Sequence, residues 1–331
     1  MTLRDEVGQL SWVAKRYSSP RRIRQQWGVT RTTTLPPLPK RRRQPGEVWG
    51  VGVVRDEADI IVPVITHLLD QGVDHVLVAD NRSVDGTLAL LGDLARRDSR
   101  VHVAQDAEPA HLQSEKVSWL ANRAWRAGAD WIVPFDADEF WFGLRGTVAE
   151  TLRSSSAGIV HAAFHHMVPV EAAPADPVRA DHLMDTVSSF PGKVAARAHP
   201  LLEIHPGNHA ASRVGGETTG LAIAHAQYRG PAQIARKVRQ GAASSRLTGH
   251  EMSWFAPHWT KGAQLDDAAI EDVWRTISSG RPDPRIEFAV RGEMVRVRPG
   301  EWNSWDPEGV LTAIDRRRGT DRLPDRPGEG E

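Results

Sequence analysis

Short apolar runs alternate with amphipathic segments along the first half of the chain. The apolar runs have strand length and cover residues 48–54, 75–79, 101–104 and 131–135. The segments between them carry apolar residues at helical spacing, over 59–72, 87–97 and 114–128. Apolar strands that alternate with helices form parallel sheets covered on both sides. The pattern therefore predicts an α/β fold with a mostly parallel, Rossmann-like sheet and helices on both faces.

The second half is less regular. Further helices are expected at 147–153, 231–240 and 268–278, and further strands at 158–164, 199–209 and 221–226. The pattern divides the chain into a basic, partly disordered leader and linker (1–46), an ordered domain (47–260), and a C-terminal helical extension that ends in a polar tail (261–331).

Composition limits the chemistry and the location. The 331 residues carry no formal net charge and include no cysteine, which excludes disulfides, thiolate nucleophiles and cysteine zinc sites. The longest apolar runs, such as 60–65, are too short to cross a bilayer, and the N-terminal residues lack a signal-peptide pattern. We therefore expect a cytoplasmic protein.

The charge is unevenly distributed. Residues 1–46 hold eleven lysines and arginines but two acids. Two interpretations of this leader are open: a solvated segment, or one that attracts an anionic polymer or the anionic inner face of a membrane. We expect no specific nucleic-acid partner.

Polar residues follow three of the predicted strands, at Arg55 to Glu57, Asp80 to Thr87 and Asp136 to Glu139. Because open α/β sheets bind ligands at the carboxyl ends of their strands, one ligand could contact all three loops. On an extended backbone Asp136 and Asp138 face the same side, where they could hold a hard divalent cation with diphosphate oxygens. The alternative is a set of ordinary capped turns.

Two further residues fit a nucleotide. Asp80 could accept hydrogen bonds from a base or a ribose. Lys116 lies in the first turn of a predicted helix, where the helix N-terminus and the ammonium group both favour phosphate. Gly50 and Gly52 lie inside a strand with no third glycine after them, so a dinucleotide fingerprint is not indicated.

The order and spacing of these motifs resemble the GT-A glycosyltransferases of family 2. The matching motifs are V-V-R-D-E at 53–57, D-N-x-S-x-D-G-T at 80–87 and D-x-D-E-F at 136–140. The resemblance implies a nucleotide-diphosphate sugar donor, a divalent metal (Mn²⁺ or Mg²⁺) and inversion at the anomeric carbon. It divides the ordered domain into a nucleotide-sugar half (47–145) and an acceptor half (146–260).

The resemblance also implies roles for residues. Those assigned to nucleotide-sugar binding are Arg55, Glu57, Asp80, Asn81, Ser83, Asp85, Lys116, Asp136 and Arg229. Asp136 and Asp138 would hold the metal. Eight of the fourteen histidines lie within 161–225, and two of these, first His225 and then His209, are candidates to complete the metal shell.

An inverting transfer needs a general base near the acceptor hydroxyl. The candidates are Glu139, Glu203, His209 and Glu217. Glu203 and Glu217 rank first because they lie in the acceptor half. Arg229 and Lys237 could neutralise the leaving diphosphate.

The sequence therefore predicts a metal-dependent, inverting, hexosyltransferase-type enzyme. It would move a sugar from a nucleotide-diphosphate sugar to a hydroxyl of a glycan, a lipid or a small molecule. One alternative is a sugar-phosphate nucleotidyltransferase, which the lack of a glycine-rich loop with Arg or Lys after the first strand disfavours. The other is a non-catalytic nucleotide- or carbohydrate-binding protein on the same sheet.

Overall fold

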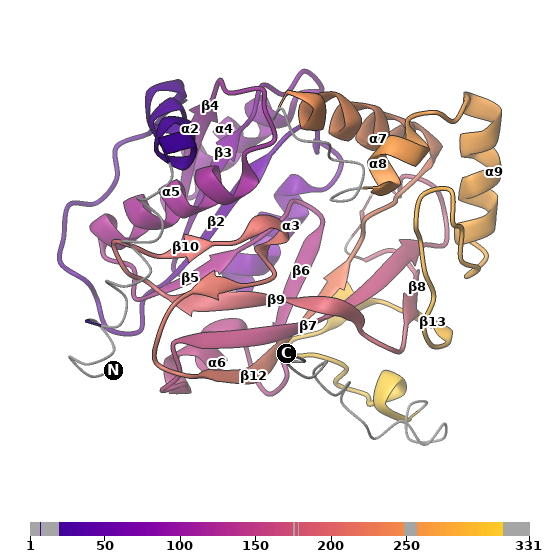
Figure 1. Cartoon of the computed structure of the whole chain (residues 1–331). Coiled ribbons are helices and arrows are strands. Elements are labelled where there is room, and N and C mark those ends of the chain that lie inside the picture. The colour runs from indigo at the N-terminus through magenta and orange to yellow at the C-terminus, as the bar shows by residue number, and fades with distance from the viewer. Residues whose placement is uncertain (1–6, 8–19, 175, 178, 248–256, 314–331) are drawn as a thin grey trace, which may run out of the picture.

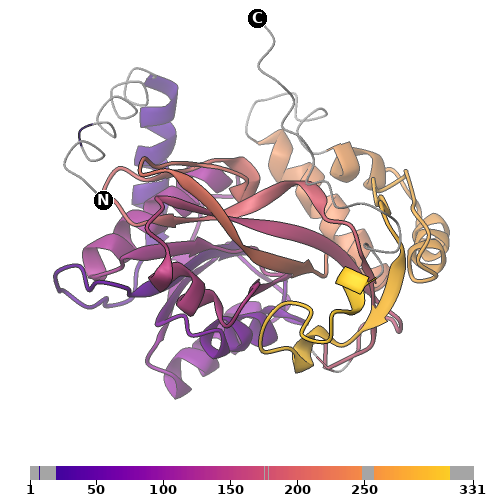
Figure 2. The same ribbon diagram turned by 90° about the horizontal axis from the view of Figure 1, so that it is seen from below.

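The computed structural model describes residues 7, 20–174, 176–177, 179–247 and 257–313. A large mixed sheet runs through the molecule, with helices on both of its faces (Figure 1). The same layers are visible from below (Figure 2). The α/β prediction is confirmed. No described helix is both long and apolar enough to cross a membrane.

The first half of the sheet follows the predicted strand–helix order. Its strands run parallel in the order β4-β3-β2-β5, with bounds β2 (Val48–Val54), β3 (His75–Asp80), β4 (Val101–Asp106) and β5 (Trp131–Pro134). The helices between them are α3 (Ile61–Asp70), α4 (Thr87–Arg97) and α5 (Gln113–Ala127). The bounds lie close to those predicted, because apolar strands and helical apolar stripes are the patterns that burial requires.

Two apolar cores lie on the two faces of this sheet. One is covered by α3, α4 and α6 (Val148–Ser154), and the other by α5 and α2 (Pro20–Thr32). Phe135 packs closely on β2: a Cβ atom at Gly52 would lie 2.8 Å from the Phe135 carbonyl oxygen and 2.9 Å from its ring. This close approach explains a glycine inside a buried strand.

The second half of the sheet adds antiparallel pairs. Its strands are β6 (Glu139–Gly143), β7 (Ile159–Pro169), β9 (Ser189–Arg197) and β12 (Glu217–His225). They follow β5 in the order β9-β7-β12-β6, in which β12 runs parallel to β7 and the other pairs are antiparallel. Residues 135–138 link β5 to β6, so Asp138 lies in a turn and not on the extended backbone that the sequence suggested.

Pro134 stands at the end of β5. That strand pairs with β9 only at Trp131 and Ile132, whereas Pro134 pairs with Val51 of β2. Because β9 has already left β5 at this point, the missing amide hydrogen of Pro134 costs no bond to β9.

Smaller elements complete the fold. They are β1 (Thr33–Thr34), β8 (His182–Asp185), β10 (Glu203–Ile204), β11 (Ala211–Ser212), β13 (Met294–Val297), α7 (Pro231–Arg246), α8 (Pro257–Gly262), α9 (Asp267–Ile277), and the 3₁₀ turns η1 (Pro206–Asn208) and η3 (Pro299–Glu301). A third apolar core holds α7 and α9 together at one end of the sheet (Figure 1). The strand predicted over 199–209 is reduced to β10, because η1 follows it directly.

Part of the basic leader packs on the domain. Val29 of α2 is fully buried, and Arg43 forms an ion pair with the buried Asp130. The leader and linker expected over 1–46 include the helix α2 and the strand β1, which pairs with β4. The end of the polar tail expected within 261–331, from residue 314 on, lies outside the described residues.

Candidate active site

A cavity of about 840 Å³ opens at the carboxyl ends of β2 and β5. Its walls come from the loops after β2, β4 and β5, the start of β9, and α7 and α8. The sequence-predicted residues that line it are Arg55, Glu57, Asn81, Lys116, Asp136, Asp138, His209, His225 and Lys237. The predicted residues that lie off its surface are Asp80, Ser83, Asp85, Glu139, Glu203, Glu217 and Arg229.

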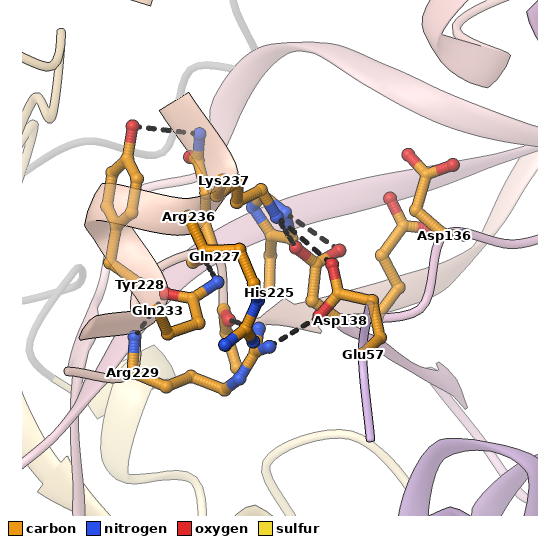
Figure 3. A network of polar contacts seen from close by, with 12 residues as sticks. Glu57, Asp136, Asp138, His225, Gln227, Tyr228, Arg229, Gln233, Arg236 and Lys237 are labelled. Atoms are coloured by element: carbon orange, nitrogen blue, oxygen red, sulfur yellow. Dashed lines mark hydrogen bonds and ion pairs between the residues drawn. The ribbon is translucent and has the colours of Figure 1, made fainter. Parts of the chain in front are cut away.

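Asp138 and His225 meet in the wall of this cavity. Antiparallel pairing of β6 with β12 sets His225 opposite Glu139, which brings the turn after β5 to the end of β12. The His225 Nε2 atom lies 3.4 Å from Asp138 Oδ1, and the Ala226 amide donates to the Asp138 carbonyl over 2.9 Å. Lys237 of α7 forms an ion pair with the other carboxylate oxygen (Figure 3).

These contacts decide which groups carry charge. Burial alone would raise the pKa of Asp138, but the Lys237 ammonium and His225 hold that pKa well below its ordinary range. Burial lowers the pKa of His225, although Asp138 opposes the shift. Burial also lowers the pKa of His166 to about 3. At neutral pH the site therefore presents an anionic carboxylate beside neutral imidazoles.

His166 supports His225 from behind. The two Nδ1 atoms lie 3.3 Å apart. When His225 carries its hydrogen on Nδ1, that hydrogen is donated to neutral His166, and the Nε2 lone pair points to the side of Asp138. A metal-ligating histidine is commonly oriented by a partner on its second nitrogen in this way.

Asp138 and His225 fit a divalent metal as two protein ligands. Two neighbouring ligands at about 2.1 Å from one ion lie about 3 Å apart, close to the spacing seen between these atoms. The described residues contain no group of three or more His, Asp or Glu side chains placed to hold one ion. The remaining positions would therefore fall to diphosphate oxygens and water, as is usual for Mg²⁺.

Asp136, the other predicted metal ligand, is held by protein groups. It accepts hydrogen bonds from Lys193 Nζ at 2.7 Å, Gln113 Nε2 at 2.9 Å and Asn208 Nδ2 at 3.1 Å. Lys193 also lies 2.7 Å from Glu139. Burial opposes the charge on Lys193, but the two carboxylates more than offset it and raise its pKa.

The Glu139 side chain stabilises the turn that carries Asp136 and Asp138. Its Oε2 atom accepts a hydrogen bond from the Asp136 amide at 3.0 Å and lies 3.3 Å from Trp141 Nε1. Burial raises its pKa to about 7, although Lys193 opposes the shift. Glu139 is fully buried and off the cavity surface, so its position is that of a turn support and not of a base in contact with substrate.

Arg229 lies behind the cavity, in contrast to its predicted place on the donor. It is buried and forms an ion pair with Glu57 (Figure 3). It also donates from Nε to Asp59 Oδ2 at 2.6 Å. The Arg229 guanidinium therefore neutralises Glu57 and fixes its position in the cavity wall. On α7, the cationic side chains that line the cavity are those of Arg236 and Lys237.

The loop at 80–87 is a network of capped turns. Asp80 Oδ2 accepts from the Ser83 amide at 3.1 Å, Ser83 Oγ accepts from the Asp56 amide at 2.9 Å, and Asp85 Oδ1 accepts from the Thr87 amide at 3.0 Å. These three side chains thus shape the loop beside the cavity. Within the described structure, the buried Asp80 Oδ1 atom has no hydrogen-bond partner.

Next to this loop, Lys116, Asn81 and Asp106 form a polar cluster. Lys116 Nζ is 2.7 Å from Asp106 Oδ2, and Asn81 Nδ2 donates to the same oxygen at 2.8 Å. Burial lowers the pKa of Lys116, against the opposing effect of Asp106. Lys116, Asn81 and the neighbouring Arg55 all line the cavity, and Asn81 Nδ2 is held by Asp106 and Glu108.

The three remaining candidates lie in different places. Glu217 is exposed at the far end of β12 from His225, and pairs with His161 at 2.8 Å. Glu203 lies in β10, off the cavity surface. His209 does face the cavity, where its Nδ1 atom lies 2.7 Å from the Gly192 carbonyl oxygen.

Several cavity residues escaped the sequence analysis. Among them are Gln113, Lys193, Arg236 and Glu287. Glu287 has a φ of 54°, in the left-handed region that non-glycine residues rarely adopt, and such strained residues are frequent at functional sites. No motif marked it, because it lies in the region assigned to a C-terminal extension. The aromatic residue Trp259 also lines the cavity.

Comparison with known proteins adds little to this geometry. No protein-family model and no curated protein matches the sequence. One solved structure to which this chain is similar is the mannosyltransferase PcManGT from Pyrobaculum calidifontis, in complex with GDP-Man and Mn²⁺. It is 16% identical with a TM-score of 0.38, and the match covers 84% of this chain and 88% of that one. A match this distant assigns no activity to this chain, and membership of family 2 stays a prediction.

Proposed function

We propose that the chain is a metal-dependent glycosyltransferase that uses a nucleotide-diphosphate sugar. The observation that carries this proposal is the meeting of Asp138, His225 and Lys237 in one wall of the cavity, at the carboxyl end of the sheet. A carboxylate and a neutral imidazole suit a divalent cation, and the lysine suits a phosphate oxygen. The motif resemblance, which also includes Asp138, implies the same roles for these residues.

The residues would divide the work by position. Asp138 and His225 would hold the metal, which offsets negative charge on the leaving diphosphate when bound. Lys237 and Arg236 add fixed positive charge along α7. Asn81, Arg55 and Lys116 would contact the nucleoside at the other end of the cavity.

Glu287 is the best-placed general base for an inverting transfer. The acidic residues that line the cavity are Asp56, Glu57, Asp136, Asp138 and Glu287. All but Glu287 are held by contacts within the site: Asp56 accepts from the Val84 amide and Gln240, and the others pair with Arg229 or a cavity lysine. Glu287 pairs at 2.7 Å with Lys261, whose side chain is exposed.

The reaction follows from this placement. The acceptor oxygen forms a bond to the anomeric carbon, while the bond from that carbon to the diphosphate oxygen breaks. The acceptor proton passes to the Glu287 carboxylate, and the nucleoside diphosphate leaves toward Lys237. Attack opposite the leaving group inverts the anomeric carbon.

A donor screen tests the proposal. Purified protein is incubated with a panel of nucleotide sugars, with Mn²⁺ or with EDTA, and released nucleoside diphosphate is measured. We expect release from one donor class that requires the metal and is lost in Asp138→Asn but not in the surface variant Asp93→Asn. Release of pyrophosphate from a nucleoside triphosphate and a sugar 1-phosphate, supplied in a parallel reaction, would instead favour a nucleotidyltransferase. No turnover of any donor in either reaction would favour a binding protein.

A further inference from the structure

The helix α2 presents an unusual outer surface. Its Val29 is fully buried against the domain, whereas Trp27 is 65% and Ile23 is 42% exposed. These two residues are four apart, so they lie on the same side of the helix, one turn from each other. Large apolar side chains that lie together on a surface mark an interaction site more often than isolated ones do.

The charge around these side chains has one sign. Residues 20–46 include eight lysines and arginines and no acid. Arg24 and Arg31 are exposed on α2, and the Arg31 guanidinium lies over the Trp27 ring, 4.7 Å from its centre. Arg42 is exposed further along the same segment. The outer face of α2 therefore combines an apolar ridge, made of Ile23 and Trp27, with several exposed arginines.

We propose that this face docks on an anionic lipid surface. A tryptophan and an isoleucine can insert at the depth of the headgroups, while arginines beside them contact lipid phosphates. Each arginine near an anionic bilayer strengthens binding by a modest amount, so several are needed together with the apolar ridge. A nucleic acid would match the charge but leave Ile23 without an apolar partner.

The helix α2 is joined to the sheet by backbone hydrogen bonds. Thr33 and Thr34 of β1 follow α2 directly and pair with β4, and the Thr32 carbonyl accepts from the Ala107 amide at 2.9 Å. The helix is thus attached to the catalytic domain at the end of β4, and not through a free linker. Docking would hold the whole domain at the lipid surface.

Vesicle sedimentation with the full chain tests this proposal. We expect binding to phosphatidylcholine vesicles that contain phosphatidylglycerol and little binding to phosphatidylcholine alone. Trp27→Ser should weaken binding, and the double change Arg24→Gln with Arg31→Gln should weaken it by about fivefold for each arginine removed. The matched control is Leu90→Ser with Arg96→Gln, which removes an exposed leucine and an exposed arginine from α4.

The outcomes separate the alternatives. Normal unfolding curves for the variants show that the helix change has not disrupted the domain. The proposal fails if the α2 variants bind anionic vesicles as well as the control does, or if the parent chain does not bind them. It also fails if the same variants lose binding to duplex DNA while vesicle binding is unchanged. None of these results depends on turnover of a soluble donor.

Discussion

His225 is the residue that best separates a metal site from a packed core. If its Nε2 atom is a ligand, His225→Ala should weaken Mn²⁺ affinity by at least about tenfold. His161→Ala, an exposed histidine paired with Glu217, is the control and should leave the affinity unchanged. Mn²⁺ titration and thermal unfolding are measured on both variants. A destabilised His225→Ala protein with intact Mn²⁺ affinity would contradict the ligand assignment.

Glu287 is the residue on which the catalytic proposal makes its sharpest prediction. Glu287→Gln keeps the shape of the side chain but removes the base, so turnover should fall by about 10²- to 10⁴-fold. Donor affinity should change little, because Glu287 is assigned to the acceptor side. Glu271→Gln, an exposed glutamate on α9, is the control. Near-normal turnover in Glu287→Gln would show that another group accepts the proton.

At the scale of elements, the junction of β2 with Phe135 is a point of close packing. Gly52→Ala would place a methyl group 2.8 Å from a backbone oxygen, so the strands must shift, at a cost of about 1–3 kcal/mol. Gly92 lies inside α4, where a Cβ atom would meet only an arginine side-chain atom, at 3.5 Å. Gly92→Ala should therefore stabilise the protein by about 0.5–1 kcal/mol. Urea unfolding of both variants checks the contrast, which equal effects would contradict.

Some elements could be predicted from sequence and others could not, for a physical reason. The strands and helices from β2 to β5 were predicted because each is apolar throughout or carries an apolar helical stripe. β9 was missed because it begins with half-buried Ser189 and exposed Phe190 and Pro191, which interrupt the pattern. Its pairing with β5 and β7 is long-range, and short-range spacing does not encode it.

In the candidate site, too, some residues could be predicted from the sequence and others could not. Asp138 was found because it follows an apolar strand at the sheet edge, and His225 because the motif resemblance implied a metal-binding histidine in the second half of the chain. Lys193 was missed because its contact with Asp136 spans 57 residues of sequence. Glu203 and Glu217 were ranked by their half of the chain alone, and the structure sets both off the cavity surface.

The whole molecule should lose stability as the pH falls below neutrality. Several histidines are buried neutral, among them His67, whose Nε2 atom lies 2.7 Å from the Trp141 carbonyl oxygen. Burial lowers the pKa of His67 to about 4, below its unfolded value of 6.5. The unfolded chain therefore binds more protons between these values, and stability decreases as the pH falls through 6.5 toward 4.

Urea unfolding at pH 7.5 and pH 5 measures this effect. His67 alone should contribute a loss of roughly 1–2 kcal/mol over that interval. The variant His67→Gln, which can still donate to a carbonyl, should lose correspondingly less between the two pH values. An equal loss in parent and variant would show that His67 does not titrate as its burial implies.

The central claim is that a metal held by Asp138 and His225 binds the diphosphate of a nucleotide. Calorimetric titration of UDP and GDP into the full chain, with Mn²⁺ and with EDTA, tests it most directly. For one of the two nucleotides, affinity should be at least about tenfold tighter with Mn²⁺. The ratio should fall to near one in Asp138→Asn. Equal affinity with Mn²⁺ and EDTA in the parent protein, or an unchanged ratio in Asp138→Asn, would contradict the claim.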